Sequence, residues 1–418
     1  MRSDRANAMA EKSDRPRVVY VLTSSLSVRF LHGQLTSVCM AGYDVTVISS
    51  PGEELTRASE LEGVRIIPLP MNREVSPVRD LISLWQLWSV LRRLRPSITN
   101  VATPKAGLLG GLASFFAGVP CRFYTLRGLR LESATGMQRW LLLFTEKLAC
   151  ICAHRVICVS HSLRQRAINL GLVDAKQATV FGSGSSNGVD TSRFGRDRAG
   201  QVSELRRELG IPPFTPVIGF VGRFTRDKGF VELLEAFSLV RTAFPELKLL
   251  LVGDIEEGDA PSAHICDEIR DNPNIVCTGF VADPSRYYHV MDVLALPTHR
   301  EGFPNVVLEA NAAKKPAVVS DATGAIDSVV DGITGLIVPV GDSRALAGAI
   351  GRLLSNPSLA ATMGRNAQKR AISDFQPQRI WADVTAEYRH LLEARNLPLP
   401  EVSPAGHLGQ RVRSVHHA

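Results

Sequence analysis

The sequence predicts an α/β protein with two domains, each built around a parallel β-sheet. The chain has 418 residues, of which 45% are hydrophobic, and a chain of that length normally divides its core between two domains. Short apolar runs rich in β-branched residues alternate with segments of helical periodicity, which is the pattern of βαβ units. A first series of runs opens at residues 17–23 and a second at 216–222.

The first predicted domain spans residues 17–200. Residues 24–30 follow its first strand, and after them a helix is expected that ends near Ala41. In a parallel sheet, ligands bind beyond the carboxyl ends of the strands, which makes the loops at 103–107, 125–129 and 160–162 candidates for a site. The strands are predicted from the apolar runs at 17–23, 44–50, 64–68, 98–102, 121–125 and 156–160.

The second predicted domain spans residues 201–377, and a helix at 378–395 follows it. No G-x-G-x-x-G fingerprint follows its first strand, which argues against an NAD enzyme. The polar ends of the chain, 1–16 and 396–418, lack apolar periodicity and are predicted to be disordered. The strands of this domain are predicted from the runs at 216–222, 247–253, 275–279, 293–297 and 317–320.

Composition narrows the class of protein. The seven cysteines form no C-x-x-C pair, so neither a disulfide framework nor a zinc site is expected, and a reducing cytoplasm is the default location. The net charge of +7 is a modest excess that favours phosphorylated ligands or an anionic membrane face. No basic stripe interleaved with aromatic residues supports nucleic-acid binding.

One stretch, residues 298–312, carries most of the functional signal. Glu301 and Glu309, separated by seven residues, follow a predicted buried strand at 293–297, and a helix is expected to begin at Asn305. The amides and the dipole at a helix N-terminus suit the phosphates of a nucleotide. Two glutamates in such places are more often solvated acids, and only the wider sequence favours a site.

A second motif lies upstream, where an apolar strand is followed by Gly222, Arg223, Lys228 and Gly229 in the pattern G-R-x-x-x-x-K-G. Together with the E-x7-E pair of glutamates, it resembles the retaining nucleotide-sugar glycosyltransferases of family 4. The resemblance covers about residues 18–392. It implies the GT-B fold, in which two Rossmann-like domains have parallel sheets facing a central cleft.

The resemblance also implies roles for residues of the second domain. Glu301 is expected at the donor sugar and Glu309 at the ribose hydroxyls, while Arg223 and Lys228 supply positive charge to the departing diphosphate. It implies retention of configuration, with a donor phosphate oxygen as the base. No obligatory metal or cofactor is expected, since the chain has no D-x-D motif. Further donor contacts are expected from Gly222, Gly302, Phe303, Pro304, Asn305 and Val306, with uracil lying by Gly279, Phe280 and Val281.

Acceptor contacts are expected from loops of the first domain. Family members often have a double glycine in the first loop, where this chain has Ser24 and Ser25, and a histidine where it has Arg127. An arginine can neutralise a phosphate but cannot shuttle a proton, because it stays charged. Arg29, Lys105 and Arg127 are therefore candidates to bind an acceptor phosphate, with ordinary surface salt bridges as the alternative.

Two helical stretches bear on membranes. Residues 81–95 contain Trp85 and Trp88, and residues 137–152 contain Trp140 beside basic side chains, as interfacial helices do. A sheet-covering helix shows the same stripe, and core packing is the favoured interpretation. Neither run contains an uncharged stretch that is long enough to span a bilayer. Any membrane contact is therefore expected to be peripheral.

The predicted protein is a cytoplasmic enzyme, or one on the inner face of the plasma membrane. It would move a hexose or N-acetylhexosamine from a UDP-sugar to a polyprenyl-diphosphate-linked or other glycan acceptor in capsule, exopolysaccharide or O-antigen synthesis. Two alternatives stay open. A non-hydrolysing UDP-sugar 2-epimerase shares the architecture but normally uses clustered acids and histidines that are not evident in this sequence. A catalytically inactive GT-B scaffold is disfavoured by the intact Arg223, Lys228, Glu301 and Glu309.

Overall fold

A computed structural model describes residues 15–72, 76–194, 199–256 and 259–401. These residues form two compact units. The first unit holds the described residues up to Thr125, together with Thr145–Val156 and the chain from Trp381 onward. The second unit holds Leu126–Phe144 and Ile157–Ile380.

A seven-stranded sheet follows the apolar runs of the first predicted domain, in the order β3-β2-β1-β4-β5-β6-β7. The neighbours from β3 to β5 pair in parallel. The chain runs outward from β1 to β3 and then returns to place β4 beside β1, which makes a topological switch point between β1 and β4. The strands are β1 (Arg17–Val21), β2 (Asp44–Ser49), β3 (Arg65–Pro68), β4 (Ile98–Ala102), β5 (Cys121–Leu126), β6 (Arg155–Cys158) and β7 (Ala178–Thr179).

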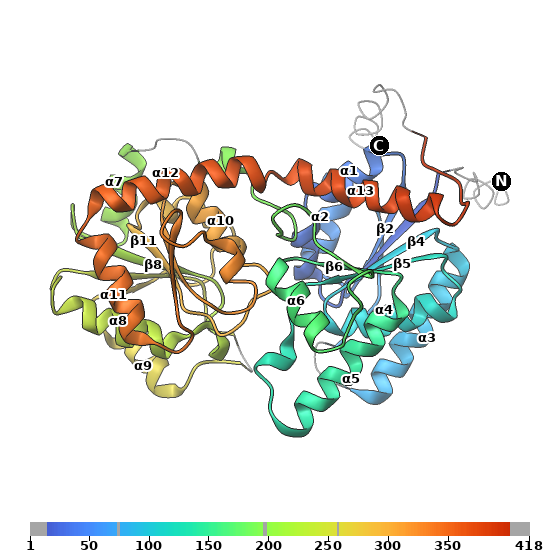
Figure 1. The fold of residues 1–418 in the computed structure, drawn as a ribbon, viewed down its shortest axis with the longest axis horizontal. Helices are drawn as coiled ribbons and strands as arrows, with labels where there is room; N and C mark the ends of the chain where they lie inside the picture. The colour runs from blue at the N-terminus through green and yellow to red at the C-terminus, as the bar shows by residue number, and fades with distance from the viewer. Residues whose placement is uncertain (1–14, 73–75, 195–198, 257–258, 402–418) are drawn as a thin grey trace, which may run out of the picture. The chain divides into compact units, whose positions relative to one another are not determined.

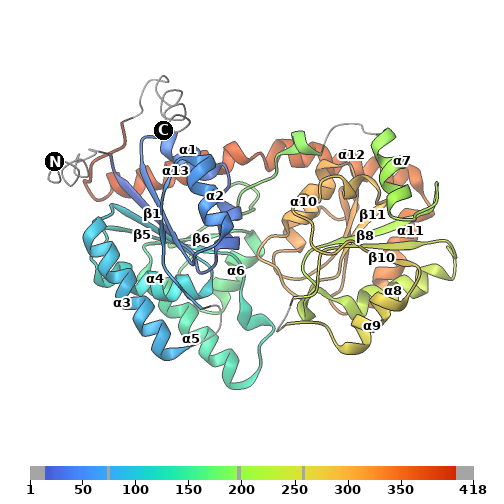
Figure 2. The same cartoon turned by 180° about the vertical axis from the view of Figure 1, so that it is seen from behind.

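Helices α1 and α2 lie on one side of this sheet and α3 and α4 on the other (Figure 1, and from behind in Figure 2). The predicted helix ending near Ala41 is confirmed as α1, which ends at Met40, and Gly33, with a φ of 75°, separates it from a 3₁₀ helix, η2, that was not predicted. A Cβ atom at Gly33 would lie 2.5 Å from the indole of Trp381. The helices of this part are η2 (Ser25–Leu31), α1 (Gln34–Met40), α2 (Glu53–Glu62), α3 (Pro77–Leu94), α4 (Pro104–Phe116), η3 (Arg130–Glu132), α5 (Gly136–Cys152), α6 (His161–Asn169) and η4 (Thr191–Arg193).

The second sheet has six strands in the order β10-β9-β8-β11-β12-β13, and all neighbouring pairs are parallel. Here too the chain returns, so that β11 lies beside β8 at a second switch point. The end strands β7 and β13 of the two sheets are additions to the predicted set. The strands are β8 (Val217–Val221), β9 (Lys248–Val252), β10 (Ile275–Cys277), β11 (Val293–Leu296), β12 (Ala317–Ser320) and β13 (Gly335–Val338).

Helices α8, α9 and α11 lie on one side of the second sheet and α10 and α12 on the other (Figures 1 and 2). Helix α8 packs against α11, and α10 packs against α12. Both faces of the sheet are therefore covered, which explains why its strands are continuous apolar runs. The helices are α7 (Ala199–Glu208), η5 (Arg226–Lys228), α8 (Phe230–Arg241), α9 (Ala263–Asp271), η6 (Tyr287–His289), α10 (Asn305–Ala312), η7 (Ile326–Ser328), α11 (Ser343–Leu354) and α12 (Pro357–Asp374).

The last helix, α13 (Pro377–Glu393), contributes its residues from Trp381 onward to the first unit. Tyr388 is fully buried there. Its hydroxyl accepts a hydrogen bond of 2.6 Å from Asn100 and donates one of 3.1 Å to Tyr20, which ties the helix to β4 and β1. The ends predicted to be disordered, 1–16 and 396–418, lie for the most part outside the described residues.

Core packing is the wrong interpretation for two of the tryptophans. Trp85 on α3 is 64% exposed, and Trp140 on α5 is exposed as well, whereas Trp88 is half-buried with the guanidinium of Arg92 over its ring. The buried stripe of α3 consists instead of Ser83, Leu87 and Leu91. No helix within the described ranges combines the length and the apolar character needed to cross a membrane.

Candidate active site

The candidate site lies in the second unit, at the carboxyl ends of β8 and β11. The loop after β8 runs from Gly222 through η5 to α8, and the loop after β11 runs from Pro297 to α10. The two strands are hydrogen-bonded neighbours. Because β8 and β11 flank the switch point, both loops leave the sheet at the same edge, where ligands bind in open α/β sheets.

Two glycines allow close approach of the backbone in these loops. Gly229 has a φ of 71°, and a Cβ atom there would lie 2.0 Å from the carbonyl oxygen of Pro297. A Cβ atom at Gly302 would lie 2.1 Å from the carbonyl oxygen of Arg127. Neither position can accept a side chain unless the backbone moves, so both loops depend on glycine for their path.

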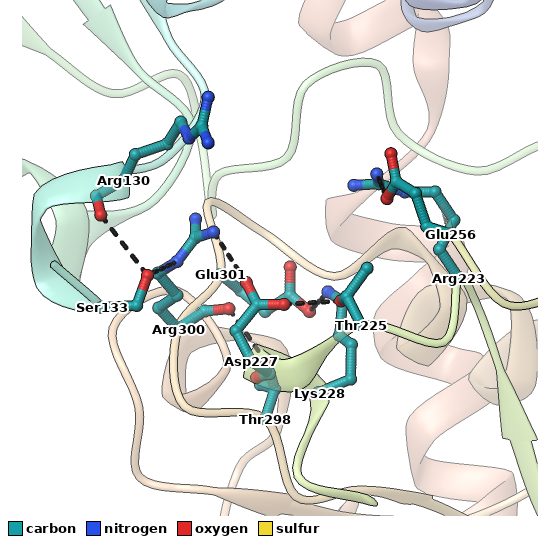
Figure 3. A network of polar contacts seen from close by, with 10 residues as sticks. All are labelled: Arg130, Ser133, Arg223, Thr225, Asp227, Lys228, Glu256, Thr298, Arg300 and Glu301. Atoms are coloured by element: carbon teal, nitrogen blue, oxygen red, sulfur yellow. Dashed lines mark hydrogen bonds and ion pairs between the residues drawn. The ribbon is translucent and has the colours of Figure 1, made fainter. Parts of the chain in front are cut away.

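The structure brings two of the predicted catalytic residues together. The Nζ atom of Lys228, at the end of η5, forms an ion pair with Oε1 of Glu301 (Figure 3). Their side chains are only 16% and 15% exposed, so solvent screens this attraction less than that of a surface pair. An anion that enters the site would compete with Glu301 for the lysine ammonium.

Arg223, the third predicted catalytic residue, does not join this pair. Its guanidinium contacts the carboxylate of Glu256, and Figure 3 shows these two residues apart from Lys228 and Glu301. The Arg223 side chain is 60% exposed, and exposed ion pairs contribute only about 0–1 kcal/mol. Arg223 can therefore exchange Glu256 for a ligand at little cost, and its role at a diphosphate stays a prediction.

A second ion pair, which the sequence did not single out, lies beside the first. Nη2 of Arg300 lies 2.7 Å from Oδ2 of Asp227, and Thr225 donates a hydrogen bond of 2.6 Å to the other carboxylate oxygen. Burial raises the pKa of Asp227, but Arg300, the Thr225 hydroxyl and Lys228 outweigh burial and hold that pKa below its ordinary value. One signal for this pair was available in the sequence: Asp227 directly precedes Lys228, and Arg300 directly precedes Glu301, so each is next to a motif residue of opposite charge.

The loops after β8, β9 and β10 also meet at this edge. The amide of Gly253 donates a hydrogen bond of 3.1 Å to the carbonyl of Gly279. A Cβ atom at Gly253 would lie 1.9 Å from the carbonyl oxygen of Gly222. Two predicted donor contacts are thus joined through a glycine that was not predicted. Phe280 is exposed beside them and Val281 is half-buried, so the ring of Phe280 offers a face for stacking.

Glu309 lies on α10 and contacts Tyr288. The Tyr288 hydroxyl donates a hydrogen bond of 2.5 Å to Oε2 of Glu309. Burial raises the pKa of Glu309 to about 7, against the opposing effects of the Tyr288 hydrogen bond and the charge of Arg193. This carboxyl group therefore changes its charge near neutral pH.

The predicted donor segment between the two glutamates turns its larger side chains toward the protein. Phe303 and Pro304 are buried, and Val306 is half-buried in the first turn of α10. Oδ1 of Asn305 accepts a hydrogen bond of 3.2 Å from the Ser185 hydroxyl. Because their side chains are buried, Phe303 and Pro304 would contact a ligand through their backbone atoms.

Four of the predicted acceptor residues lie in the first unit. Ser24 and Ser25 follow β1, and Ser25 accepts a hydrogen bond of 2.9 Å from an amide at the start of α2. Arg29 forms an ion pair of 2.6 Å with Glu54, and Lys105 forms one of 2.8 Å with Asp80. The salt bridges of the alternative interpretation are therefore present, and acceptor binding by these residues stays a prediction.

Arg127, the fifth predicted acceptor residue, belongs to the second unit. Its carbonyl oxygen lies against Gly302, next to Glu301. Nearby, Glu132 of η3 accepts a hydrogen bond of 2.9 Å from Thr323. The carbonyl of Thr323 in turn accepts one of 2.9 Å from the Glu301 amide. The segment that carries Arg127 thus braces the loop that carries Glu301.

The fold and this site define a class of protein. Two Rossmann-like parallel sheets, each with a switch point, are the arrangement of GT-B glycosyltransferases. A solved structure with this fold is that of Anabaena Alr3699/HepE in complex with UDP and glucose. It matches with a TM-score of 0.75 and 20% identity, over 90% of this chain and 99% of that one.

Sequence comparison identifies the family. Residues 28–184 match the model of the glycosyl transferase 4-like domain, and residues 201–370 match that of the glycosyl transferases group 1. The capsular polysaccharide biosynthesis glycosyltransferase CapM of Staphylococcus aureus is 37% identical, over 90% of this chain and 98% of that protein. The UDP-Gal:alpha-D-GlcNAc-diphosphoundecaprenol alpha-1,3-galactosyltransferase of Escherichia coli is 25% identical, over 80% and 85%. This chain belongs to the family 4 glycosyltransferases, which have the GT-B fold.

Proposed function

We propose that this glycosyltransferase moves a hexose or N-acetylhexosamine from a UDP-sugar, with retention of configuration, to a glycan acceptor carried on a polyprenyl diphosphate. The observation that carries the proposal is the shielded contact of Lys228 with Glu301 at the switch point of the second sheet. One group suits the departing diphosphate and the other suits a sugar hydroxyl, and both lie where one elongated donor would bind.

The names of the relatives support the biosynthetic setting. CapM is named for capsular polysaccharide biosynthesis, and the E. coli relative is named for transfer from UDP-galactose to a sugar on diphosphoundecaprenol. The proposal extends these two features, a surface polysaccharide and a lipid-linked acceptor, to the present chain. Capsule, exopolysaccharide and O-antigen synthesis all fit them.

The chemistry asks the protein mainly to stabilise charge and to orient the acceptor. The bond between the anomeric carbon and the diphosphate oxygen breaks, and the acceptor oxygen forms its bond on the same face of the sugar. The acceptor proton passes to an oxygen of the departing diphosphate. Lys228 and Arg223 would exchange Glu301 and Glu256 for that diphosphate and neutralise its growing charge. Glu301, freed from Lys228, would accept a hydrogen bond from a sugar hydroxyl.

Glu309 and the glycine loops would hold the nucleoside. An ionised Glu309 can accept hydrogen bonds from both ribose hydroxyls. The exposed ring of Phe280, beside the joined loops of Gly222 and Gly279, would stack on uracil. Because Lys228 and Arg223 supply positive charge, the proposal includes no obligatory metal.

The acceptor half of the proposal rests on the first unit and on Arg127. Lys105 lies after β4, at the switch point of the first sheet, and Arg29 lies after β1. Both can exchange their carboxylate partners for an acceptor phosphate. A lipid-linked acceptor also places the enzyme at the inner face of the plasma membrane, where the exposed side of α3 would make a peripheral contact.

A transfer screen tests this proposal. Purified protein is incubated with UDP-, GDP- and ADP-sugars, with and without a polyprenyl-diphosphate sugar and with EDTA, and products are identified by mass spectrometry and NMR. We expect transfer from one UDP-sugar to the lipid, an α linkage from an α donor, and activity that survives EDTA. Glu301→Ala should abolish transfer, whereas Glu268→Gln, at a half-buried glutamate on α9, should not.

The other outcomes of the screen identify the alternatives. Interconversion of UDP-sugars in the absence of any acceptor would replace the transferase proposal with an epimerase. Failure to bind any sugar nucleotide would leave a scaffold and contradict the roles given to Lys228 and Glu301. An inverted product linkage would contradict retention alone.

A further inference from the structure

Two ion pairs and one contact between a histidine and a glutamate connect the two loops of the candidate site. Residues 227, 228 and 232 lie on one loop and the helix start that follows it, and residues 299 to 301 lie on the other. Asp227 contacts Arg300, Lys228 contacts Glu301, and Glu232 contacts His299 at 3.0 Å. The first two pairs lie side by side with reversed polarity (Figure 3). Each loop therefore presents an acid next to a base.

The Asp227–Arg300 pair is anchored on several sides. The carbonyl of Asp227 accepts hydrogen bonds from the amide of His299, at 2.8 Å, and from the hydroxyl of Thr298, at 3.0 Å. Nε of Arg300 donates a hydrogen bond of 2.8 Å to Ser133, which follows η3 (Figure 3). Arg300 thus connects the Glu301 loop both to the Lys228 loop and to the segment that follows β5.

We propose that Asp227 and Arg300 are positioning residues for the transfer reaction, which keep the two loops in register when Lys228 leaves Glu301 for the donor diphosphate. This inference rests on the proposed function. Without a ligand, the Lys228–Glu301 pair helps to join the loops. When the donor binds, the Lys228 ammonium contacts a phosphate in place of Glu301. The Asp227–Arg300 pair then joins the two loops.

The charges of the pair suit this task. Because Asp227 and Arg300 neutralise each other's charge, the positive potential at the diphosphate comes from Lys228 and Arg223. The lowered pKa of Asp227 keeps its carboxylate ionised at neutral pH. Each residue directly adjoins a reacting group in the chain, and a displacement of about 1 Å at an active site can cost about 100-fold in rate.

The test is a double-mutant cycle with a conservative variant. Asp227→Asn, Arg300→Gln and the double variant are compared with wild type in kcat and KM for the UDP-sugar, in UDP affinity and in thermal midpoint. We expect each single variant to lower kcat by about 10- to 100-fold, with a smaller change in UDP affinity. The double variant should be no slower than the slower single variant, because both remove the same contact. Arg300→Lys should recover part of kcat.

The controls separate this inference from the proposed function. Arg270→Gln removes an arginine that pairs with acids of α9 and should keep wild-type kcat. Wild-type kcat in Asp227→Asn and Arg300→Gln, with Lys228→Ala inactive, would overturn the positioning role and leave the proposed function intact. A lowered thermal midpoint with unchanged kcat of the folded protein, or losses that multiply in the double variant, would also overturn it. A wild-type protein without transfer activity would overturn the proposed function itself.

Discussion

The hydroxyl of Tyr288 donates a hydrogen bond of 2.5 Å to Oε2 of Glu309, on the helix that begins four residues after Glu301. Burial brings the pKa of Glu309 to about 7. If the ionised form binds the ribose, affinity for the UDP-sugar should increase about tenfold between pH 6 and pH 8, as the ionised fraction rises. Calorimetric titration with the intact UDP-sugar measures this, since its diphosphate does not titrate in that range.

Two variants make this pH prediction specific. Glu309→Gln should abolish the pH dependence, because no carboxyl group remains. Tyr288→Phe should move the midpoint to higher pH, because the Tyr288 hydrogen bond lowers the pKa of Glu309. An unchanged pH profile in Glu309→Gln would assign the titration to another group and contradict ribose binding by an ionised Glu309.

A buried acid, Glu146 of α5, should make the stability of the first unit depend on pH. Its only hydrogen bond among the described contacts is the one of 2.5 Å from Tyr124, and burial raises its pKa to about 7 from an ordinary value of 4.5. The folded state then binds the proton more tightly than the unfolded state. The group's contribution to stability is greatest below the unfolded pKa and is lost as pH rises to about 7.

Glu146→Gln should therefore remove part of this loss, and we expect it to raise stability at pH 8 relative to pH 5 by about 1–3 kcal/mol. Amide hydrogen exchange in β5 and in the part of α5 after Thr145 measures it, because those amides report on the first unit. Glu60→Gln, at an exposed position of α2, is the control and should change nothing. Equal pH dependence of Glu146→Gln and wild type would show that the Glu146 carboxyl is not the cause.

Gly229 tests how closely the backbones of the two loops must approach. It has a φ of 71° and leaves no room for a Cβ atom beside the carbonyl of Pro297, whereas Gly210 has a φ of 65° and nothing within 4 Å of such an atom. Both alanine variants pay the cost of left-handed backbone, about 1 kcal/mol. Only Gly229→Ala must push the loops apart, so it should lower kcat by about 100-fold.

The comparison of these two glycine variants needs only thermal unfolding and transfer rates. Gly210→Ala should lower the thermal midpoint by a small amount and keep wild-type kcat. Similar rates in the two variants would mean that the contact between Gly229 and Pro297 does not place Lys228.

Much of this architecture can be predicted from the sequence, because parallel strands that are buried on both faces are uninterrupted apolar runs in the sequence. The strands at 44–49, 98–102 and 293–296 lie within one residue or so of the predicted ones. The contact of Lys228 with Glu301 was harder to predict from the sequence, because it forms only when the chain returns to place β11 beside β8. The resemblance supplied the pairing of their motifs, and the sheet order accounts for it physically.

The partners of the site residues were harder to predict. Asp227 and Arg300 look like solvated loop charges until the loops are placed together, and periodicity says nothing about loops. Tyr288 lies on a short 3₁₀ turn, η6, far from Glu309 along the chain. The exposed tryptophans were misassigned because an amphipathic stripe does not reveal which of its faces meets the sheet, and smaller residues fill the buried face of α3.

The exposed face of α3 leads to the last prediction. Val78, Leu81, Ile82 and Trp85 are exposed at helical spacing, and the exposed Arg79, Arg92 and Arg93 lie on the same helix. An apolar stripe with a tryptophan and flanking arginines suits an anionic bilayer surface, where each arginine contributes about 1 kcal/mol and each buried large side chain about 1.5–3 kcal/mol. The protein should therefore bind phosphatidylglycerol vesicles more tightly than phosphatidylcholine vesicles, and less tightly at high salt.

Vesicle sedimentation compares wild type with a double variant of α3 and with a control variant of α2. Leu81→Ala combined with Trp85→Ala should weaken binding to anionic vesicles at least about tenfold, because it removes two of the side chains that would enter the interface. Leu61→Ala, at an exposed leucine of α2 on the other side of the first sheet, should leave binding unchanged. Equal binding by the α3 variant and wild type would move the membrane contact to another surface, while transfer to a water-soluble acceptor would remain normal in both cases.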